Sequence, residues 1–225
     1  MMIAEKLQQV KATLKPGVRL VAVSKFHPAE ALQEAYDAGQ RIFGESHVQE
    51  LVAKQEVLPK DIEWHFIGHL QTNKVKYIAP FINLIHSVDS VKLLKEIDKQ
   101  AAKADRVVDV LLQVHVAKEE TKFGFAPDEL LDMLATEEWK TLQHVCLAGL
   151  MAMATNTDDT AQIAREFDTV SQLFAVAKER FFATEPAFRE ISMGMSGDYL
   201  IAQEHGSTMV RIGTTIFGQR NYGNG

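Results

Sequence analysis

The feature that most constrains this 225-residue chain is an alternation of short, apolar, β-rich runs with longer segments of helical spacing. Strands that each lead into a helix are typical of βα units on a parallel sheet. The predicted strands lie at residues 19–25, 41–45, 63–68, 84–88, 107–116, 144–152, 188–193 and 209–217. Eight such units in about 200 residues match one closed (β/α)8 barrel, a TIM barrel. A doubly wound open sheet is the alternative, because alternation alone does not prove closure.

An extra helix is predicted before the first strand. Ile3, Leu7, Val10 and Leu14 recur at helical spacing, and proline and glycine then stop the pattern. We expect this leading segment, residues 1–17, to pack on the barrel within a single domain that spans residues 1–225. Its interspersed charges argue against a signal peptide, and no run reaches the ~18 apolar residues of a membrane span.

Composition narrows the class of partner. The chain has 24 Lys and Arg against 30 Asp and Glu, a formal charge of −6, and so lacks the broad basic surface that binds nucleic acid. Its single cysteine, Cys146, permits neither an internal disulfide nor a zinc site built on several thiolates. The apolar run around Cys146 predicts a buried, unreactive thiol. We expect a monomer of the reducing cytoplasm that binds neither nucleic acid nor membrane.

Lys25 stands at the end of the first predicted strand. The carboxyl ends of barrel strands carry the functional residues, so a polar side chain there has more weight than one elsewhere. A solvated surface lysine is the simpler interpretation. The chemical interpretation is that burial lowers the pKa of an amine, and the neutral amine then condenses with an aldehyde.

Two loops rich in glycine and hydroxyl groups follow the seventh and eighth predicted strands. In the first, Ser196 is predicted to cap a helix at residues 198–205, and the adjacent glycines let backbone N–H groups approach an anion. A plain helix cap is the simpler interpretation. The second loop contains Gly213 and Thr214. Loops at these two places form the recurrent phosphate site of this architecture.

Arg211 lies inside an apolar predicted strand, where an unpaired guanidinium is costly. One interpretation is a salt bridge to a barrel carboxylate such as Glu45. The other is a donor to a ring nitrogen or a phosphate of a ligand. Together, Lys25, the two loops and Arg211 describe a site for an aldehyde that carries a phosphate.

Four histidines offer a different hypothesis, a metal-dependent hydrolase. His65, His69, His86 and His115 fall on or just beyond neighbouring predicted strands. His65 and His69 are four residues apart, whereas a spacing of two residues places a pair of side chains on the same face at one strand end. No acidic residue is placed to complete a ligand set. We therefore expect core or loop histidines and no bound metal.

Seven motifs occur in order along the chain. They are VAVSK at 21–25, FGE at 43–45, WHFIG at 64–68, LQTNK at 70–74, GLMA at 149–152, SMGMS at 192–196 and STMVRIGT at 207–214. Over essentially its whole length, the chain resembles the pyridoxal phosphate homeostasis proteins. Two positions depart from the family pattern. Ser46, before His47, replaces an asparagine and is a shorter donor, and His69 replaces a proline.

The resemblance implies a fold-type III barrel related to the N-terminal domain of alanine racemase, with pyridoxal 5'-phosphate held as an internal aldimine on Lys25. The further cofactor contacts that it implies are Ser46, Ser192, Ser196, Arg211, Gly213 and Thr214. Of these, Ser192, Ser196, Gly213 and Thr214 are implied at the phosphate. Arg211 is implied near the pyridine nitrogen, which an arginine does not readily protonate.

The leading functional hypothesis is a non-catalytic protein of intracellular pyridoxal phosphate homeostasis, without catalytic residues, which delivers the cofactor to apo-enzymes. The alternative is a pyridoxal phosphate-dependent amino-acid racemase. Racemisation needs acid and base groups on both faces of the substrate Cα, and in racemases a second domain contributes one of them. This chain ends at residues 222–225, soon after the eighth predicted strand, which favours the binding protein.

Overall fold

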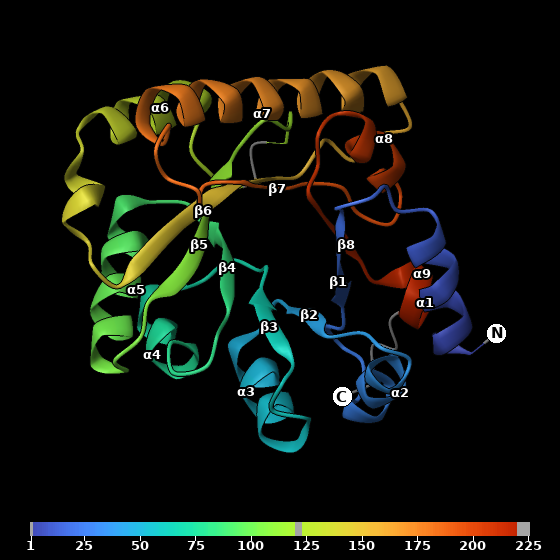
Figure 1. Cartoon of the computed structure of the whole chain (residues 1–225). Helices are drawn as coiled ribbons and strands as arrows, with labels where there is room; N and C mark the ends of the chain where they lie inside the picture. Colours follow the sequence, from blue (N-terminus) through green and yellow to red (C-terminus); the bar gives the residue numbers. More distant parts are fainter. Residues whose placement is uncertain (1, 120–122, 220–225) are drawn as a thin grey trace.

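The strands close into a barrel in which each is parallel to both neighbours (Figure 1). The computed structural model describes residues 2–119 and 123–219; residues 222–225, cited above, lie outside them. The strands are β1 (Arg19–Val23), β2 (Ile42–Glu45), β3 (Glu63–Phe66), β4 (Leu84–Val88), β5 (Val108–Val114), β6 (Val145–Ala152), β7 (Glu190–Ser192) and β8 (Met209–Ile212). Val21 of β1 pairs with Arg211 of β8, which closes the sheet. The predicted TIM barrel is confirmed, and the open sheet is wrong.

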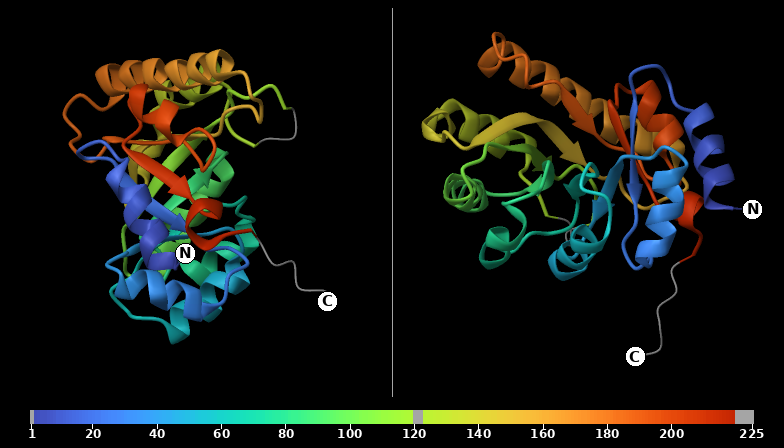
Figure 2. Two further views of the ribbon diagram at one scale, coloured as in Figure 1. Left: turned by 90° about the vertical axis from the view of Figure 1, so that its right-hand side faces the viewer. Right: turned by 60° about the horizontal axis from the view of Figure 1, so that its bottom comes forward.

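Helices surround the barrel (Figure 2). They are α1 (Ile3–Ala12), α2 (Ala29–Asp37), α3 (Val48–Val57), α4 (Val75–Ile78), α5 (Val91–Lys103), α6 (Pro127–Ala135), α7 (Thr160–Phe181), α8 (Tyr199–Glu204) and α9 (Thr214–Phe217). Short 3-10 turns lie at Thr72–Lys74 and Glu138–Thr141. The predicted leading helix is α1, which packs beside α2 and α9 with Leu7 and Val10 buried. Among the described residues, no helix combines the length and apolar character needed to cross a membrane.

The eighth predicted strand is wrong in its second half. β8 ends at Ile212, and the next residues form the helical turn α9. β-branched and aromatic residues here favoured a strand, but the amides of Ile216 and Phe217 both donate to the carbonyl of Gly213. Ile216 is fully buried. Tertiary packing outside the barrel thus outweighs local β-propensity.

A bulge in β6 decides which of its side chains face the barrel interior. Ala148 and Met151 both belong to the interior apolar cluster although they are three residues apart, whereas a regular strand returns to one face every second residue. The register against β5 skips Ala148, between Leu147 and Gly149, and Gly149 has φ of 152°. A Cβ added there would lie 1.8 Å from the Glu190 carbonyl oxygen. Only glycine therefore fits the bulge.

Candidate functional site

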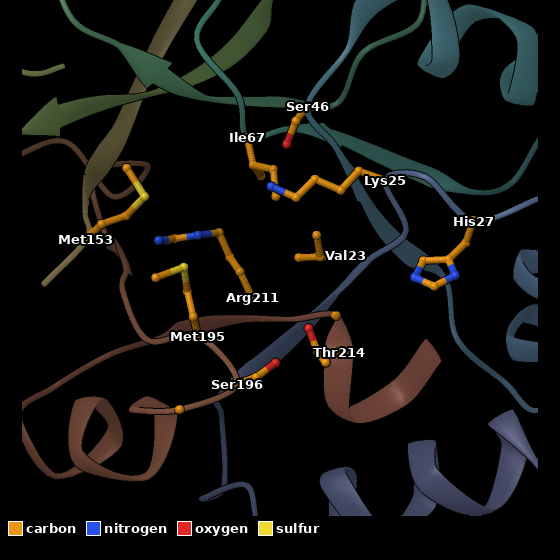
Figure 3. Close-up of a pocket in the computed structure, with 12 residues that line it drawn as sticks. Val23, Lys25, His27, Ser46, Ile67, Met153, Met195, Ser196, Arg211 and Thr214 are labelled. Carbon is orange, nitrogen blue, oxygen red and sulfur yellow. The ribbon is translucent and has the colours of Figure 1, made fainter. Parts of the chain in front are cut away.

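A cavity of about 240 Å³ opens at the carboxyl ends of the strands, with apolar and polar walls (Figure 3). Its lining residues are Val23, Lys25, His27, Ser46, Ile67, Met153, Met195, Ser196, Gly197, Arg211, Gly213 and Thr214. Six of the seven site residues expected from the sequence are among them. The Lys25 side chain reaches into the cavity from one wall, and the hydroxyls of Ser196 and Thr214 lie together on another (Figure 3).

Ser192 is the expected residue that does not line the cavity. It is fully buried at the end of β7. Its hydroxyl lies 2.6 Å from Nη1 of Arg211 and 2.9 Å from Nδ1 of His86. Ser192 therefore contacts the cavity through Arg211.

Arg211 is buried beside the cavity and is held by three acceptors. Nη1 donates to the backbone oxygen and hydroxyl of Ser192 at 2.8 and 2.6 Å, and Nη2 donates to the Ala152 carbonyl at 3.0 Å. Burial lowers the pKa of Arg211 to about 10, so the guanidinium keeps its charge at neutral pH. These contacts leave Nε–H and one N–H of Nη2 for a ligand.

The predicted Arg211–Glu45 salt bridge is wrong. The preceding residue, Gly44, faces the interior, where an added Cβ would lie 2.8 Å from Val21 Cγ1. Strand alternation turns Glu45 to the outer face of the barrel. There its Oε1 accepts a hydrogen bond from Lys54 at 2.7 Å.

Lys54 of α3 is the centre of a buried assembly that we call the charged cluster, made of Ser24, Glu45, Glu50 and Lys54. Besides Glu45, the ammonium donates to Glu50 Oε1 at 2.7 Å and to the Ser24 backbone oxygen at 2.8 Å. The Ser24 hydroxyl also donates to Glu45, at 2.6 Å. Lys54 and Glu45 are 6% and 0% exposed. The two carboxylates share one ammonium, so their charges are only partly balanced.

The charged cluster fixes the backbone on both sides of Lys25. Lys54 binds the carbonyl of the residue before it, and Glu50 Oε1 accepts the amide of Phe26, the residue after it, at 2.6 Å. Phe26 has φ of 66°, in the left-handed region that costs a non-glycine residue energy. This turn directs Lys25 into the cavity.

Glu45 is the titratable member of the cluster. Burial raises its pKa to about 7, against the opposing effect of Lys54. Its Oε2 atom has no hydrogen-bond partner within the described residues. Glu45 is therefore a buried carboxyl whose ionisation falls near neutral pH.

The predicted helix cap at Ser196 is wrong. The N-cap of α8 is Asp198, and its Oδ1 accepts the Met195 amide at 2.5 Å. Ser196 is instead in the tight loop that follows Gly194, which has φ of 97° and no room for a Cβ beside Ala202. This loop leaves the Ser196 side chain at the cavity wall.

The four histidines are engaged by protein groups. His65 and His86 bond to each other at 2.9 Å. His69 pairs with Asp89 at 3.2 Å, and His115 bonds to a backbone oxygen. No cluster of three or more His, Cys, Asp or Glu side chains within residues 2–119 and 123–219 is arranged to hold a metal ion.

Cys146 is half-buried, where the sequence predicted a buried thiol. It lies near the start of β6, beside a second cavity at the amino ends of the strands. Burial and the nearby Asp109 carboxylate raise the pKa of the thiol. Its low reactivity thus remains a prediction, now on electrostatic grounds.

The apolar wall of the cavity is not predicted from the sequence. Val23, Ile67, Met153 and Met195 line it, although at or near strand ends they look like ordinary core residues in the sequence. His27 and Gly197 were also missed. Only the convergence of separate strand ends in three dimensions distinguishes such residues from the core.

Known proteins of similar sequence identify the family to which this chain belongs. The sequence matches the alanine racemase N-terminal domain family over residues 2–221. A pyridoxal phosphate homeostasis protein of Pasteurella multocida is 40% identical over 223 residues, covering 98% of this chain and 94% of that protein. The protein of the same name from Escherichia coli is 39% identical over 212 residues, covering 91% and 87%.

Solved structures agree. PipY of Synechococcus elongatus, without pyridoxal phosphate, superposes with a TM-score of 0.90 at 39% identity, covering 96% of this chain and all of that one. The form with pyridoxal phosphate bound gives 0.87. Alanine racemase of Clostridium difficile gives 0.77 at 13% identity over 57% of its length, which concerns the fold alone.

These matches define a class of barrels that resemble the first domain of alanine racemase. Within that class, the chain belongs to the pyridoxal phosphate homeostasis protein family.

Proposed function

We propose that this protein binds pyridoxal 5'-phosphate in the cavity at the carboxyl ends of the strands and serves the intracellular homeostasis of that cofactor without catalysing a reaction. The observation that carries the proposal is the arrangement of an amine, Lys25, opposite the hydroxyls of Ser196 and Thr214 in one cavity. PipY, a relative at 39% identity, has a structure with pyridoxal phosphate bound.

The donors in the cavity fit the chemistry of this cofactor. When bound, pyridoxal phosphate supplies an aldehyde that bonds reversibly to a primary amine. Lys25 is the amine that would hold it. Ser196, Gly213 and Thr214 would hold the phosphate. A Cβ added at Gly213 would lie 2.8 Å from the Val23 carbonyl oxygen, so the chain passes closely there.

The remaining lining residues would orient the ring. Val23, Ile67, Met153 and Met195 supply apolar surface. Arg211 would donate to the pyridine nitrogen without giving up its proton, because its pKa of about 10 keeps it charged. An unprotonated ring nitrogen withdraws electrons weakly, which supports binding over catalysis. Ser46 would donate at the rim, and Ser192 would act by holding Arg211.

The proposal is tested by the visible absorption of protein purified with pyridoxal phosphate and by borohydride trapping of the covalent bond. Wild type and Lys99→Ala, an exposed lysine on α5, should both retain a trapped adduct. Lys25→Ala should lose it. An adduct that persists in Lys25→Ala, or is absent from wild type, would refute the assignment.

A racemase is the second candidate, because the chain belongs to the family named for alanine racemase and two side chains that can act as bases, Lys25 and His27, line the cavity. Single enantiomers of amino acids should stay optically unchanged with the loaded protein. Turnover that disappears in Lys25→Ala would favour the racemase.

We further infer that residues 1–225 work as one domain, as a monomer in the cytoplasm, and pass the cofactor to apo-enzymes. The described elements all belong to one barrel and its helices, which supports the single domain. Light scattering of loaded protein should give the mass of one chain. Transfer is tested by adding an apo pyridoxal phosphate enzyme and following its recovery of activity.

A further inference from the structure

A continuous line of polar side chains crosses the interior of the barrel. We call it the histidine chain: His65 of β3, His86 of β4, Ser192 of β7 and Arg211 of β8. Successive links measure 2.9, 2.9 and 2.6 Å, and none of the four residues is more than 4% exposed. The chain lies among the apolar side chains of the interior cluster. Buried polar groups in such surroundings are costly unless each is paired.

The direction of every hydrogen bond in the histidine chain follows from one residue. A guanidinium only donates, so the Ser192 hydroxyl accepts from Arg211. Among the residues that the structure describes, the hydrogen of that hydroxyl has one acceptor within reach, Nδ1 of His86. His86 then carries its own hydrogen on Nε2 and donates to Nδ1 of His65. His65 in turn carries its hydrogen on Nε2.

Burial keeps both imidazoles neutral, which this sequence of bonds requires. It lowers the pKa of His65 to about 3, and burial together with neighbouring positive groups holds the pKa of His86 well below its usual value. A positive charge on His86 would be opposed by the charge of Arg211, which is one of the groups that lower the pKa of His86. The charge of Arg211 is thus the only one in the histidine chain.

The far end of the histidine chain opens at the opposite mouth of the barrel. His65 lines a cavity of about 450 Å³ together with residues at the amino ends of the strands, among them Arg19, Asp109 and Glu190. No described protein group pairs with its Nε2. The ring therefore presents one N–H to that cavity while its other nitrogen holds the histidine chain.

We propose that His86 is a positioning residue for the cofactor site: by accepting the Ser192 hydroxyl hydrogen, it turns the serine lone pairs to Arg211 and so fixes the guanidinium at the cavity, with His65 completing the chain. The inference rests on the proposed function, since it states how the ring-binding arginine is oriented. Without His86, the Ser192 hydroxyl can rotate and Arg211 loses one of its three fixed acceptors.

The first experiment needs no cofactor. Long-range ¹⁵N–¹H spectra of the unloaded protein should show His65 and His86 neutral at pH 6, each with its hydrogen on Nε2 and an unprotonated Nδ1. A hydrogen on Nδ1 of His86, or a charged imidazolium at either position, would overturn the proposed direction of the bonds. The tautomers test the direction of the bonds, whereas the affinities of the variants test the role of His86 at the cofactor site.

The second experiment measures the Kd for pyridoxal phosphate. His86→Leu should weaken binding about tenfold, the effect of one lost hydrogen bond at a buried site, while Lys25 still forms a borohydride-trapped adduct. His86→Asn, whose amide oxygen can accept the Ser192 hydroxyl, should restore most of the affinity. Ser87→Ala, a buried neighbour on β4 outside the histidine chain, should bind like wild type.

Different outcomes would refute the role of His86 and the proposed binding of pyridoxal phosphate. Wild-type affinity in a folded His86→Leu variant, or equal losses in His86→Leu and His86→Asn, would overturn it. Should His86→Leu not fold, the tautomers still test the direction of the bonds, and a large loss of affinity in a folded His86→Asn variant would overturn the inference. A wild type that binds no pyridoxal phosphate refutes the function, whereas the tautomers are measured independently.

Discussion

Two polar assemblies position the two cationic side chains of the cavity, Lys25 and Arg211, and they are built differently. The charged cluster lies on the outer face of the barrel and fixes the backbone around Lys25 with two carboxylates and an ammonium. The histidine chain lies inside the barrel and holds the Arg211 side chain with neutral groups. The charged cluster fixes the path of the backbone at Lys25, whereas the histidine chain fixes the orientation of the Arg211 side chain.

This comparison predicts different costs. Buried ions depend strongly on their partners, because removing one leaves the other uncompensated. Neutral groups lose less, because an unpaired dipole is cheaper to bury than an unpaired charge. Variants of the cluster should therefore affect mainly the free energy of unfolding, and variants of the histidine chain mainly the affinity for the cofactor.

The largest effect should come from Lys54→Met. It leaves two carboxylates, Glu45 and Glu50, without their shared ammonium, so we expect a loss of about 3–5 kcal/mol in the free energy of unfolding at pH 8. Urea denaturation measures it. Lys99→Met, at an exposed position, is the control and should change little. Equal stability of the two variants would contradict the role of the cluster.

The second effect is a pH dependence that belongs to Glu45. Its folded-state pKa of about 7 lies above the ordinary 4.5, so the folded state binds the proton more tightly. The associated stabilisation is complete below pH 4.5 and is lost as the pH rises through 7. Relative to Glu45→Gln, wild type should lose up to about 3 kcal/mol between pH 4.5 and 8.

The measurement is a set of urea titrations at half-unit pH steps. The variant Glu56→Gln, at an exposed position on α3, the helix that carries Lys54, should follow wild type throughout. A constant difference between wild type and Glu45→Gln across this range would show that Glu45 does not change its ionisation there.

The smallest effect compares two buried serines. Ser24→Ala removes a hydroxyl that donates to Glu45 and should cost about 1 kcal/mol of unfolding free energy. The Ser87 hydroxyl has no partner among the described residues, so Ser87→Ala should cost nothing or stabilise. Thermal unfolding of the two variants side by side tests this. A larger loss in Ser87→Ala would reverse the assignment.

The sequence predicted what local pattern and barrel geometry control. Strand order and the place of Lys25 follow from alternation, because strand ends converge in any closed barrel. The partners of buried charges do not follow from it. Glu50 and Lys54 are four residues apart on one helix, which in sequence looks like an ordinary surface ion pair. Only the structure shows them under the turn that carries Lys25.

The errors have the same origin. The cost of an unpaired guanidinium makes a salt bridge from Arg211 to Glu45 one interpretation of the sequence, but Gly44 faces the interior and Glu45 the outside. Residues after Gly213 favour a strand locally, yet packing turns them into α9. In each case, a contact between distant segments overrides a preference that the sequence displays locally.

The bulge at Gly149 shifts the alternation of side chains in β6 by one residue. Before it, Leu147 faces the helices and Ala148 the interior; after it, Leu150 faces the helices and Met151 the interior. Without the extra residue, β6 would pair regularly with β5, because Leu147 and Gly149 pair with the consecutive residues Val110 and Leu111. The bulge therefore decides which side chains of the second half face the interior, Met151 and then Met153 at the cavity, and a barrel with a regular sixth strand would need a different residue pattern to present the same surface.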